Sequence, residues 1–204
     1  GIKNIDFNEL KKSIVDLDNH ANLVLVDTAA TLGSETLKVL EVVDETIVVT
    51  NTDKGAMADA LKTTEKLAED NFFVVNADDI FEASLIKQMN QQFHKGDAEI
   101  ILSCKPVTQT WKFGIIQVED EQVTNFVEKP PKGKEPSNLA VVGVYILTKQ
   151  IFDYYKKIPV SDHQYEDAIL AFIKDRNVVK AVSYDQFFAG YKYPWDLFTI
   201  SKHL

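Results

Sequence analysis

The chain lacks the features that mark secreted, membrane and nucleic-acid-binding proteins. Its single cysteine, Cys104, lies in an apolar run, so a disulfide framework is excluded and a reducing compartment is expected. No apolar stretch approaches the roughly 20 residues of a membrane-spanning helix, and the polar amino terminus does not read as a signal peptide. The formal net charge of −9 argues against nucleic acid, because phosphate contacts need clustered basic side chains. We therefore expect a cytoplasmic protein without membrane or nucleic-acid partners.

The chain also lacks a glycine-rich loop. It has eight glycines, and no two of them lie within four residues of each other. Loops that hold a triphosphate on backbone amides need closely spaced glycines at a helix start. The four histidines share no spacing typical of metal ligands, so a histidine metal site is not expected. Trp111 and Trp195 are expected to be packing residues.

What is present is the pattern of one large α/β domain. With 204 residues and 45% hydrophobic content, the chain can bury about 70% of its unfolded surface, and we expect a single domain over residues 1–204. Apolar residues spaced for one helical face predict helices at Asp6–Leu17, Ser34–Val43, Ala56–Ala68, Phe81–Phe93, Lys149–Lys157, Tyr165–Asp175 and from near Pro194. Short runs rich in β-branched residues predict strands at Leu23–Val26, Thr46–Thr50, Phe72–Asn76, Glu99–Ser103, Ile115–Glu119, Gln122–Val127, Leu139–Leu147 and Val178–Tyr184.

The order of these elements predicts the architecture. Strands and helices alternate in the first half, which favours right-handed crossovers and a parallel sheet. In the second half, several strands follow each other with short turns, so antiparallel and mixed elements are added. The predicted fold is a three-layer, Rossmann-like α/β domain with a mixed, mainly parallel sheet.

One strand end is the best candidate for chemistry. The apolar run at Phe72–Val75, read as a central parallel strand, stops at Asp78 and Asp79. Ligands bind at the carboxyl ends of strands in open α/β sheets. Adjacent side chains on a strand point to opposite faces, so at most one of the two should face a crevice, where it could hold Mg²⁺ beside a phosphate. The alternative is that both are turn formers before the next helix.

From Ala58 onward the motifs resemble the sugar-phosphate nucleotidyltransferases, in particular glucose-1-phosphate thymidylyltransferases. These enzymes join a sugar 1-phosphate to a nucleoside triphosphate and release pyrophosphate. The matching stretches follow the family order over about residues 58–204, and they are ADAL at Ala58–Leu61, FFVVNADDIF at Phe72–Phe81, FGIIQVED at Phe113–Asp120, VEKP at Val127–Pro130, SNLAVVGVYIL at Ser137–Leu147, YEDAIL at Tyr165–Leu170 and PWDLF at Pro194–Phe198.

The resemblance implies a nucleotide-diphospho-sugar transferase-like fold and a set of site residues. Asp78 would ligate Mg²⁺, and Lys129 would hold the sugar phosphate while Glu128 bonds sugar hydroxyls. Gly114 and Gly143 would let the backbone approach the sugar closely. The implied partners are a sugar 1-phosphate and a nucleoside triphosphate. The alternative for Glu128 and Lys129 is an exposed ion pair before a loop.

The amino-terminal segment resembles a different family. The stretch LVLVDTAATLGSETLKVLEVVDETIVVTNTD at Leu23–Asp53 is similar to MinD/ParA-type P-loop ATPases, and the similarity covers about residues 5–62. It implies that Asp27 lies near a metal and γ-phosphate and that Asn51 lies near a nucleotide base. That family's own phosphate loop is absent. The chain thus reads as a mosaic of a MinD-like segment over residues 1–57 and a transferase-like segment over residues 58–204.

Two departures from the transferase pattern bear on activity. The glycine-rich triphosphate loop is missing, and the position of the family's second metal aspartate falls on Gly190. The predicted function is therefore a nucleotidyltransferase-like protein that acts with Mg²⁺ and whose activity is weak or lost. The alternative is a non-catalytic chimera, engineered or recombined, of two nucleotide-binding α/β folds. The replaced amino-terminal unit would expose new edges, through which the protein could form a homo-oligomer.

Overall fold

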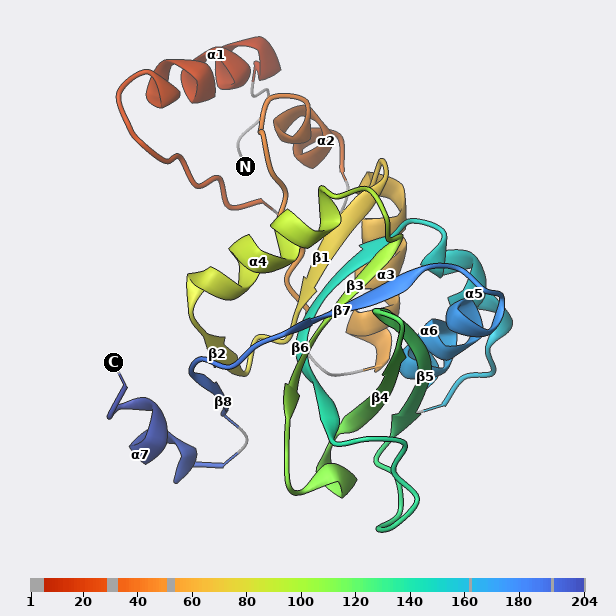
Figure 1. The fold of residues 1–204 in the computed structure, drawn as a ribbon. Helices are drawn as coiled ribbons and strands as arrows, with labels where there is room; N and C mark the ends of the chain where they lie inside the picture. The colour runs from red at the N-terminus through yellow and green to blue at the C-terminus, as the bar shows by residue number, and fades with distance from the viewer. Residues whose placement is uncertain (1–5, 29–32, 51–53, 162, 192, 204) are drawn as a thin grey trace. The chain divides into compact units, whose positions relative to one another are not determined.

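The computed structural model describes residues 6–28, 33–50, 54–161, 163–191 and 193–203 (Figure 1). The chain divides into two compact units, Gly1–Leu67 and Ala68–Leu204, which are described separately here. Within the described ranges no helix is both long and apolar enough to cross a membrane. Whether the two units act as the one domain expected from the sequence stays a prediction.

The first unit consists of helices α1 (Phe7–Asp18), α2 (Ser34–Leu40) and α3 (Lys54–Leu67). Asp6 caps α1 through its carboxylate, which accepts a 2.9 Å hydrogen bond from Asn8 N, and such a cap stabilises a helix by about 1 kcal/mol. Glu41, which follows α2, pairs with Lys11 on α1 and with Lys38 on α2. These contacts hold α1 against α2.

The strands expected at Leu23–Val26 and Thr46–Thr50 are not present. The described residues of both segments belong to no helix or strand, and Leu25 and Val49 expose 81% and 84% of their surface. A β-branched sequence favours a strand only where a neighbouring strand supplies hydrogen bonds and a face to pack on. The sequence prediction was wrong here because the first unit has no described strand that could do so.

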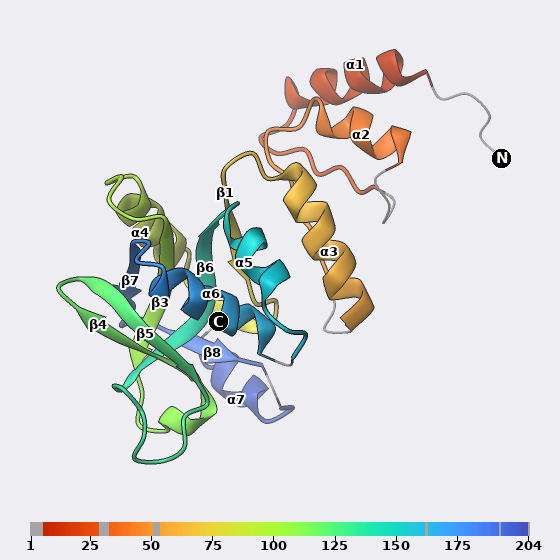
Figure 2. The ribbon, with the colours of Figure 1, turned by 90° about the vertical axis from the view of Figure 1, so that its right-hand side faces the viewer.

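The second unit is built on a six-stranded sheet (Figures 1 and 2). Its strand order is β1-β6-β3-β7-β5-β4. The strands are β1 (Asn71–Val75), β3 (Ile100–Pro106), β4 (Gly114–Glu119), β5 (Gln122–Glu128), β6 (Leu139–Thr148) and β7 (Val179–Ser183). The pairings give β1, β3, β4 and β7 one direction and β5 and β6 the other, so four of the six strands share a direction in a mixed sheet.

Three short elements were not predicted from the sequence. Strands β2 (Asp79–Phe81) and β8 (Phe188–Gly190) form a separate two-stranded antiparallel sheet, and a single 3₁₀ turn, η1 (Thr110–Lys112), precedes β4.

Strand β1, expected to be central and parallel, instead stands at the end of the six-stranded order and pairs antiparallel with β6. Strand β6, which pairs with β1, β3 and β4, is buried along nearly its whole length.

Helices cover both faces of this sheet and complete three layers. They are α4 (Ala83–Phe93), α5 (Ile151–Lys157) and α6 (Gln164–Lys174), and a short α7 (Asp196–Ile200) follows β8. Leu85 and Met89 of α4, one turn apart, pack with Val144 and Ile146 of β6 in the main core, and burying each such side chain contributes about 1.5–3 kcal/mol. On the other face Tyr145 meets Tyr165 of α6 edge to face, as strand alternation requires. The three-layer α/β class predicted from the sequence is confirmed.

Candidate functional site

A cavity of about 770 Å³ in the second unit gathers charged and aromatic side chains from several elements. Ligand sites commonly have volumes of roughly 300–1,000 Å³ and combine apolar walls with a few polar groups. The lining residues come from β2, β3, β6, β8, η1, α7 and adjoining loops, and they are Asp79, Lys105, Val107, Trp111, Lys112, Phe113, Lys129, Val142, Phe188, Gly190, Tyr193, Trp195 and Asp196. Three lysines and two aspartates in one cavity suit a phosphorylated, hydroxyl-bearing ligand.

The strand-end aspartates are divided between the cavity and solvent. Asp79 begins β2 and lines the cavity, whereas Asp78 is exposed in the preceding turn. The backbone oxygen of Asp78 accepts a 2.6 Å hydrogen bond from Tyr191 N, which ties the turn to β8. Only one of the two aspartates therefore lines the cavity. It is Asp79, whereas the family resemblance had indicated Asp78 as the metal ligand.

Gly143 sets the position of Asp79. It lies in β6 with φ +23°, and a Cβ there would overlap Asp79 Oδ2 and come within 2.7 Å of Asn76 Nδ2. Asn76 Nδ2 donates a 3.1 Å hydrogen bond to Asp79 Oδ2, and Asn76 N donates to Gly143 O at 2.8 Å. The missing side chain therefore makes room for the carboxylate. The close approach of this backbone to a sugar, implied by the resemblance, stays a prediction.

A bulge in the sheet surrounds Gly143. The register between β3 and β6 shifts between Leu102 and Cys104, and the Ser103 hydroxyl lies 2.5 Å from Val142 O and 2.8 Å from Val144 O, the carbonyls on either side of Gly143. Bulges redirect a strand locally and are frequent beside functional sites. Ser103 thus anchors the irregular backbone that accommodates Asp79.

Glu128 and Lys129 form an ion pair at the end of β5. Lys129 Nζ lies 3.4 Å from Glu128 Oε1, and the side chains are 56% and 16% exposed. A Cβ on Gly114 of β4 would come within 2.7 Å of Glu128 Oε2 and 2.9 Å of Phe126 Cζ, so this glycine makes room for the Glu128 carboxylate. Lys129 also lines the cavity. The ion pair of the alternative interpretation is present, and the role of Lys129 toward a sugar phosphate stays a prediction.

The backbone of Lys129 is strained. Its φ is +44°, a value that is uncommon for residues other than glycine, and it precedes Pro130, which disfavours helical backbone at the residue before it. Such strain costs of order 1–3 kcal/mol and tends to occur at functional sites. A 3.0 Å hydrogen bond from Lys129 N to Phe113 O holds this conformation.

Two ionisable side chains, Tyr145 and Glu166, are electrostatically coupled to Glu128. Burial, followed by the charges of Glu166, Glu128 and Asp79, raises the pKa of the Tyr145 phenol. Burial also raises the pKa of Glu166, to which the neighbouring Glu128 carboxylate adds, while His163 and Lys129 oppose the shift. The electrostatic influence of Asp79 and Glu128 thus reaches from the site to the face of the sheet that α6 covers.

Two carboxylates could hold a divalent cation in the cavity. The described residues contain no cluster of three or more His, Cys, Asp or Glu side chains with metal-binding geometry. Mg²⁺ is commonly held by one or two carboxylates together with substrate phosphates, and Asp79 and Asp196 both line the cavity. Gly190, the expected position of a second metal aspartate, is the direct β-bridge partner of Asp79. The donor set therefore fits a cation held in part by phosphate oxygens.

The two residues assigned to nucleotide binding can be followed only in part. Asp27 is exposed in the first unit and belongs to no helix or strand. Asn51 lies outside the described residues. Their roles stay predictions.

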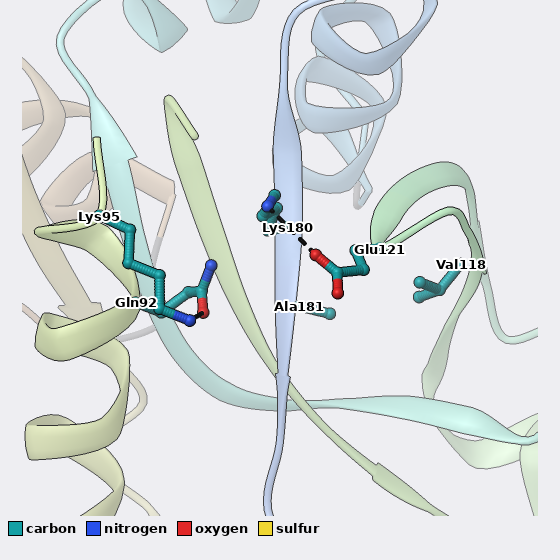
Figure 3. A pocket seen from close by; sticks show the side chains of 6 residues that line it. All are labelled: Gln92, Lys95, Val118, Glu121, Lys180 and Ala181. Atoms are coloured by element: carbon teal, nitrogen blue, oxygen red, sulfur yellow. Dashed lines mark hydrogen bonds and ion pairs between the residues drawn. The ribbon is translucent and has the colours of Figure 1, made fainter. Parts of the chain in front are cut away.

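A second hollow, of about 260 Å³, is a weaker candidate (Figure 3). Its polar centre is Lys180 of β7, whose Nζ lies 2.7 Å from Asp97 Oδ2 and 3.6 Å from Glu121 Oε2. The hydrogen bond that Lys180 Nζ donates to Asp97 raises the pKa of Lys180. Two carboxylates already neutralise this cation, and the hollow's other lysine, Lys95, donates a 2.8 Å hydrogen bond to Gln92 Oε1.

Several cavity residues were missed from the sequence. Lys105 at the end of β3 and Lys112 in η1 had no motif to mark them, although a lysine after a buried strand is a usable signal. Asp196 was read only as part of the last helix. Trp111 and Trp195, expected to be packing residues, both line the cavity, and Trp195 is 62% exposed.

Comparisons with known proteins give a consistent picture. The family model described as "Nucleotidyl transferase" matches residues 10–195. The chain is 35% identical over 138 residues to the UTP--glucose-1-phosphate uridylyltransferase of Bacillus subtilis, covering 62% of this chain and 46% of that protein. It is 29% identical over 149 residues to the bifunctional protein GlmU of Methanocaldococcus jannaschii, covering 71% and 34%. The chain thus spans less than half the length of either curated relative.

Solved structures agree on the fold. A UDP-glucose pyrophosphorylase complexed with UDP-glucose superposes with a TM-score of 0.62 at 27% identity, covering 72% of this chain and 61% of that one. A UTP-bound UGPase from Acinetobacter baumannii reaches a TM-score of 0.64 at 21% identity and covers 98% of this chain and 70% of its own. The second likeness concerns the fold alone.

Proposed function

We propose a reaction for this chain from the premise that it belongs to the nucleotidyl transferase family. The reaction is transfer of a nucleotidyl group from a nucleoside triphosphate to a sugar 1-phosphate, with UTP and glucose 1-phosphate as the first pair to test. The observation that carries the proposal is the cavity in which Lys129 and Asp79 stand with two further lysines. The name of the Bacillus subtilis relative supports the choice of substrates.

In the proposed step, an oxygen of the sugar phosphate attacks the α-phosphorus of the nucleotide. The bond between that phosphorus and the bridging oxygen of pyrophosphate breaks, and pyrophosphate leaves with the electron pair. Lys129 would hold the sugar phosphate, with Glu128 hydrogen-bonding sugar hydroxyls, and Lys105 and Lys112 would add positive charge in the same cavity. Because Gly114 and Gly143 have no side chain, they leave space for the carboxylates of Glu128 and Asp79, respectively. Catalysis of this kind depends mainly on positioning and on charge stabilisation.

A bound Mg²⁺ would screen the phosphate oxygens of both substrates. We propose Asp79 as the carboxylate that helps hold it, because Asp79 lines the cavity. Asp78 keeps the role that the sequence resemblance gave it as the competing assignment. Asn51 and Asp27 remain proposed nucleotide contacts on the MinD-like resemblance alone.

A non-catalytic chimera is the second candidate. The division of the chain into compact units at Leu67 and Ala68 falls ten residues after the proposed junction at residues 57 and 58. The family model, however, extends back to residue 10. On this reading the missing triphosphate loop leaves the protein able to bind a sugar phosphate but unable to transfer a nucleotide. A cytoplasmic location and a homo-oligomer stay predictions.

Pyrophosphate release with UTP, glucose 1-phosphate and Mg²⁺ separates the two candidates. We expect slow turnover that Lys129→Ala and Asp79→Asn each reduce at least about tenfold, with Asp78→Asn as the matched control in the neighbouring position. Loss of turnover in Asp78→Asn with Asp79→Asn unaffected would move the metal assignment to Asp78. No turnover with any tested pair of nucleoside triphosphate and sugar 1-phosphate would leave the non-catalytic candidate.

A further inference from the structure

Two aromatic side chains on the cavity wall are stacked on each other and more than half exposed. The rings of Tyr193 and Trp195, called the aromatic pair below, have centroids 4.7 Å apart and planes within 11°. They expose 55% and 62% of their surface, and both line the cavity. Large apolar rings left in water are unfavourable, so a ligand that covered them would gain from their burial.

Two other rings of the cavity wall already have a cation over them. Lys132 Nζ stands 4.0 Å from the centroid of the Trp111 ring, and Lys105 Nζ stands 5.8 Å from that of Phe188. A cation over an aromatic face occupies the negative centre of its quadrupole. Trp111, Phe113 and Phe188 are only partly exposed, so the aromatic pair is the most exposed ring surface of the cavity.

The pair is also held in place before any ligand arrives. Tyr193 N donates a 2.7 Å hydrogen bond to Asp196 Oδ2, and Asp196 N donates to Tyr193 O at 2.9 Å. These two bonds close a tight turn around Pro194 and Trp195 at the start of α7. A preorganised surface loses little conformational freedom on binding, which favours affinity.

A sugar 1-phosphate matches the three kinds of surface in this cavity. Its phosphate suits Lys129, Lys105 and Lys112, and its hydroxyls suit carboxylates such as Asp79. What remains of a pyranose is the face made of C–H groups, whose partial positive charge is attracted to the negative face of an aromatic ring. The aromatic pair is the surface that such a face would cover.

We propose that the aromatic pair stacks against the C–H face of the sugar ring and acts as a positioning element for the sugar phosphate. This inference rests on the proposed function for the choice of ligand. A nucleobase could also stack on such rings. The sugar is favoured because Lys129, proposed to hold its phosphate, lines the same cavity.

Tryptophan fluorescence gives a direct test. The chain has two tryptophans, so Trp195 is the only tryptophan left in the Trp111→Phe variant. Titration of this variant with glucose 1-phosphate should change the emission and saturate, while inorganic phosphate and UMP should leave it unchanged. A response to UMP in place of glucose 1-phosphate would overturn the proposal and assign the pair to the base.

Calorimetric titration then measures what the pair contributes. Trp195→Ala should raise the Kd for glucose 1-phosphate about three- to tenfold and leave the Kd for inorganic phosphate unchanged, and Trp195→Phe should recover most of the loss. Phe198→Ala is the matched control, since Phe198 is 72% exposed on α7 and is absent from the cavity lining. Equal affinities for the wild type and Trp195→Ala, or no binding of glucose 1-phosphate by the wild type, would overturn the inference.

The outcome is separable from the proposed function. Saturable, Trp195-dependent binding of glucose 1-phosphate without pyrophosphate release would support the stacking role and reject the transferase activity. Turnover that Trp195→Ala leaves unchanged in both kcat and KM would support the activity and reject the stacking role.

Discussion

Gly143 shows how one residue can shape the site through the side chain it does not have. Its Cβ position is filled by the carboxylate of Asp79, and its φ of +23° is rare for other residues. The same logic holds at Gly114, whose Cβ position lies against Phe126 and Glu128. The sequence marked both glycines through the family resemblance, but which side chains they accommodate could be read only from the packed structure.

Gly143→Ala should therefore displace Asp79 as well as strain the backbone. We expect a loss of about 2–3 kcal/mol in the free energy of unfolding, from overpacking added to backbone strain. Gly96→Ala is the matched control, because Gly96 has φ +72° but nothing within 4 Å of its Cβ position, and it should cost about 1 kcal/mol. Denaturant unfolding of both variants checks this. Equal losses would show that Asp79 does not occupy the space beside Gly143.

Glu166 gives a pH dependence with a defined sign. Burial and the neighbouring Glu128 raise its pKa above the ordinary value of 4.5, so the folded protein binds this proton more tightly than the unfolded chain. The resulting stability is present below pH 4.5 and is lost as the pH rises through the raised pKa of the folded state. Relative to the wild type, Glu166→Gln should gain stability as the pH rises from 4.5 to 8.

Denaturant unfolding at several pH values measures this difference. Glu119→Gln, on an exposed position of β4, serves as the control and should follow the wild type throughout. A stability difference between Glu166→Gln and the wild type that shrinks as the pH rises would contradict the account.

At the scale of elements, the bulge between β3 and β6 links the core to the site. Ser103 is fully buried and lies within hydrogen-bonding distance of the carbonyls flanking Gly143. Ser103→Ala should lower the free energy of unfolding by about 1–2 kcal/mol, since a buried acceptor loses its donor, and should weaken binding of glucose 1-phosphate by moving Asp79. Ser183→Ala, at an exposed position of β7, should do neither. Unfolding and calorimetric titration report the two effects.

The pairing of β2 with β8 allows a gain-of-function test. Asp79 stands directly opposite Gly190, the position where the transferase resemblance places a second metal aspartate. Gly190→Asp should bring a further carboxylate to the cavity, beside Asp79, and lower the Mg²⁺ concentration needed for half-maximal turnover by about tenfold. Gly190→Asn is the control of similar size without the charge. A Mg²⁺ dependence that is the same in both variants would argue against a cation at this position.

Local pattern sufficed for elements that bury a face against a neighbour. The helices α1, α4, α5 and α6 and the strands β3 to β7 lie within a few residues of their predicted bounds. It failed at Leu23–Val26 and Thr46–Thr50, because a strand also needs a partner that no local pattern reveals. It also missed β2 and β8, which are three residues each. The same limit applies to the site. The motifs marked Lys129 and Gly143, whereas the place of Lys105, Asp196 and the aromatic pair in the cavity depends on the tertiary structure.

At the scale of the whole molecule, the two units differ in how much they bury. Among the buried apolar residues described, only Ile14 and Val39 belong to the first unit. Amide hydrogens of residues 23–27 and 46–50 should exchange close to the rate of an unfolded chain, because these residues belong to no helix or strand. Those of β3 and β6 should be protected by several orders of magnitude. Strong protection of residues 23–27 would show that the strand predicted from the sequence exists after all.

The central claim is that the cavity of the second unit is a sugar 1-phosphate site. A crystal structure of the full chain grown with glucose 1-phosphate and Mg²⁺ tests it most directly. We expect the phosphate of glucose 1-phosphate to lie within hydrogen-bonding distance of Lys129 Nζ. The sugar ring should lie against Trp195, and a hydroxyl or the cation should lie beside Asp79. Ligand bound elsewhere, or a cavity that stays empty at saturating glucose 1-phosphate, would contradict it.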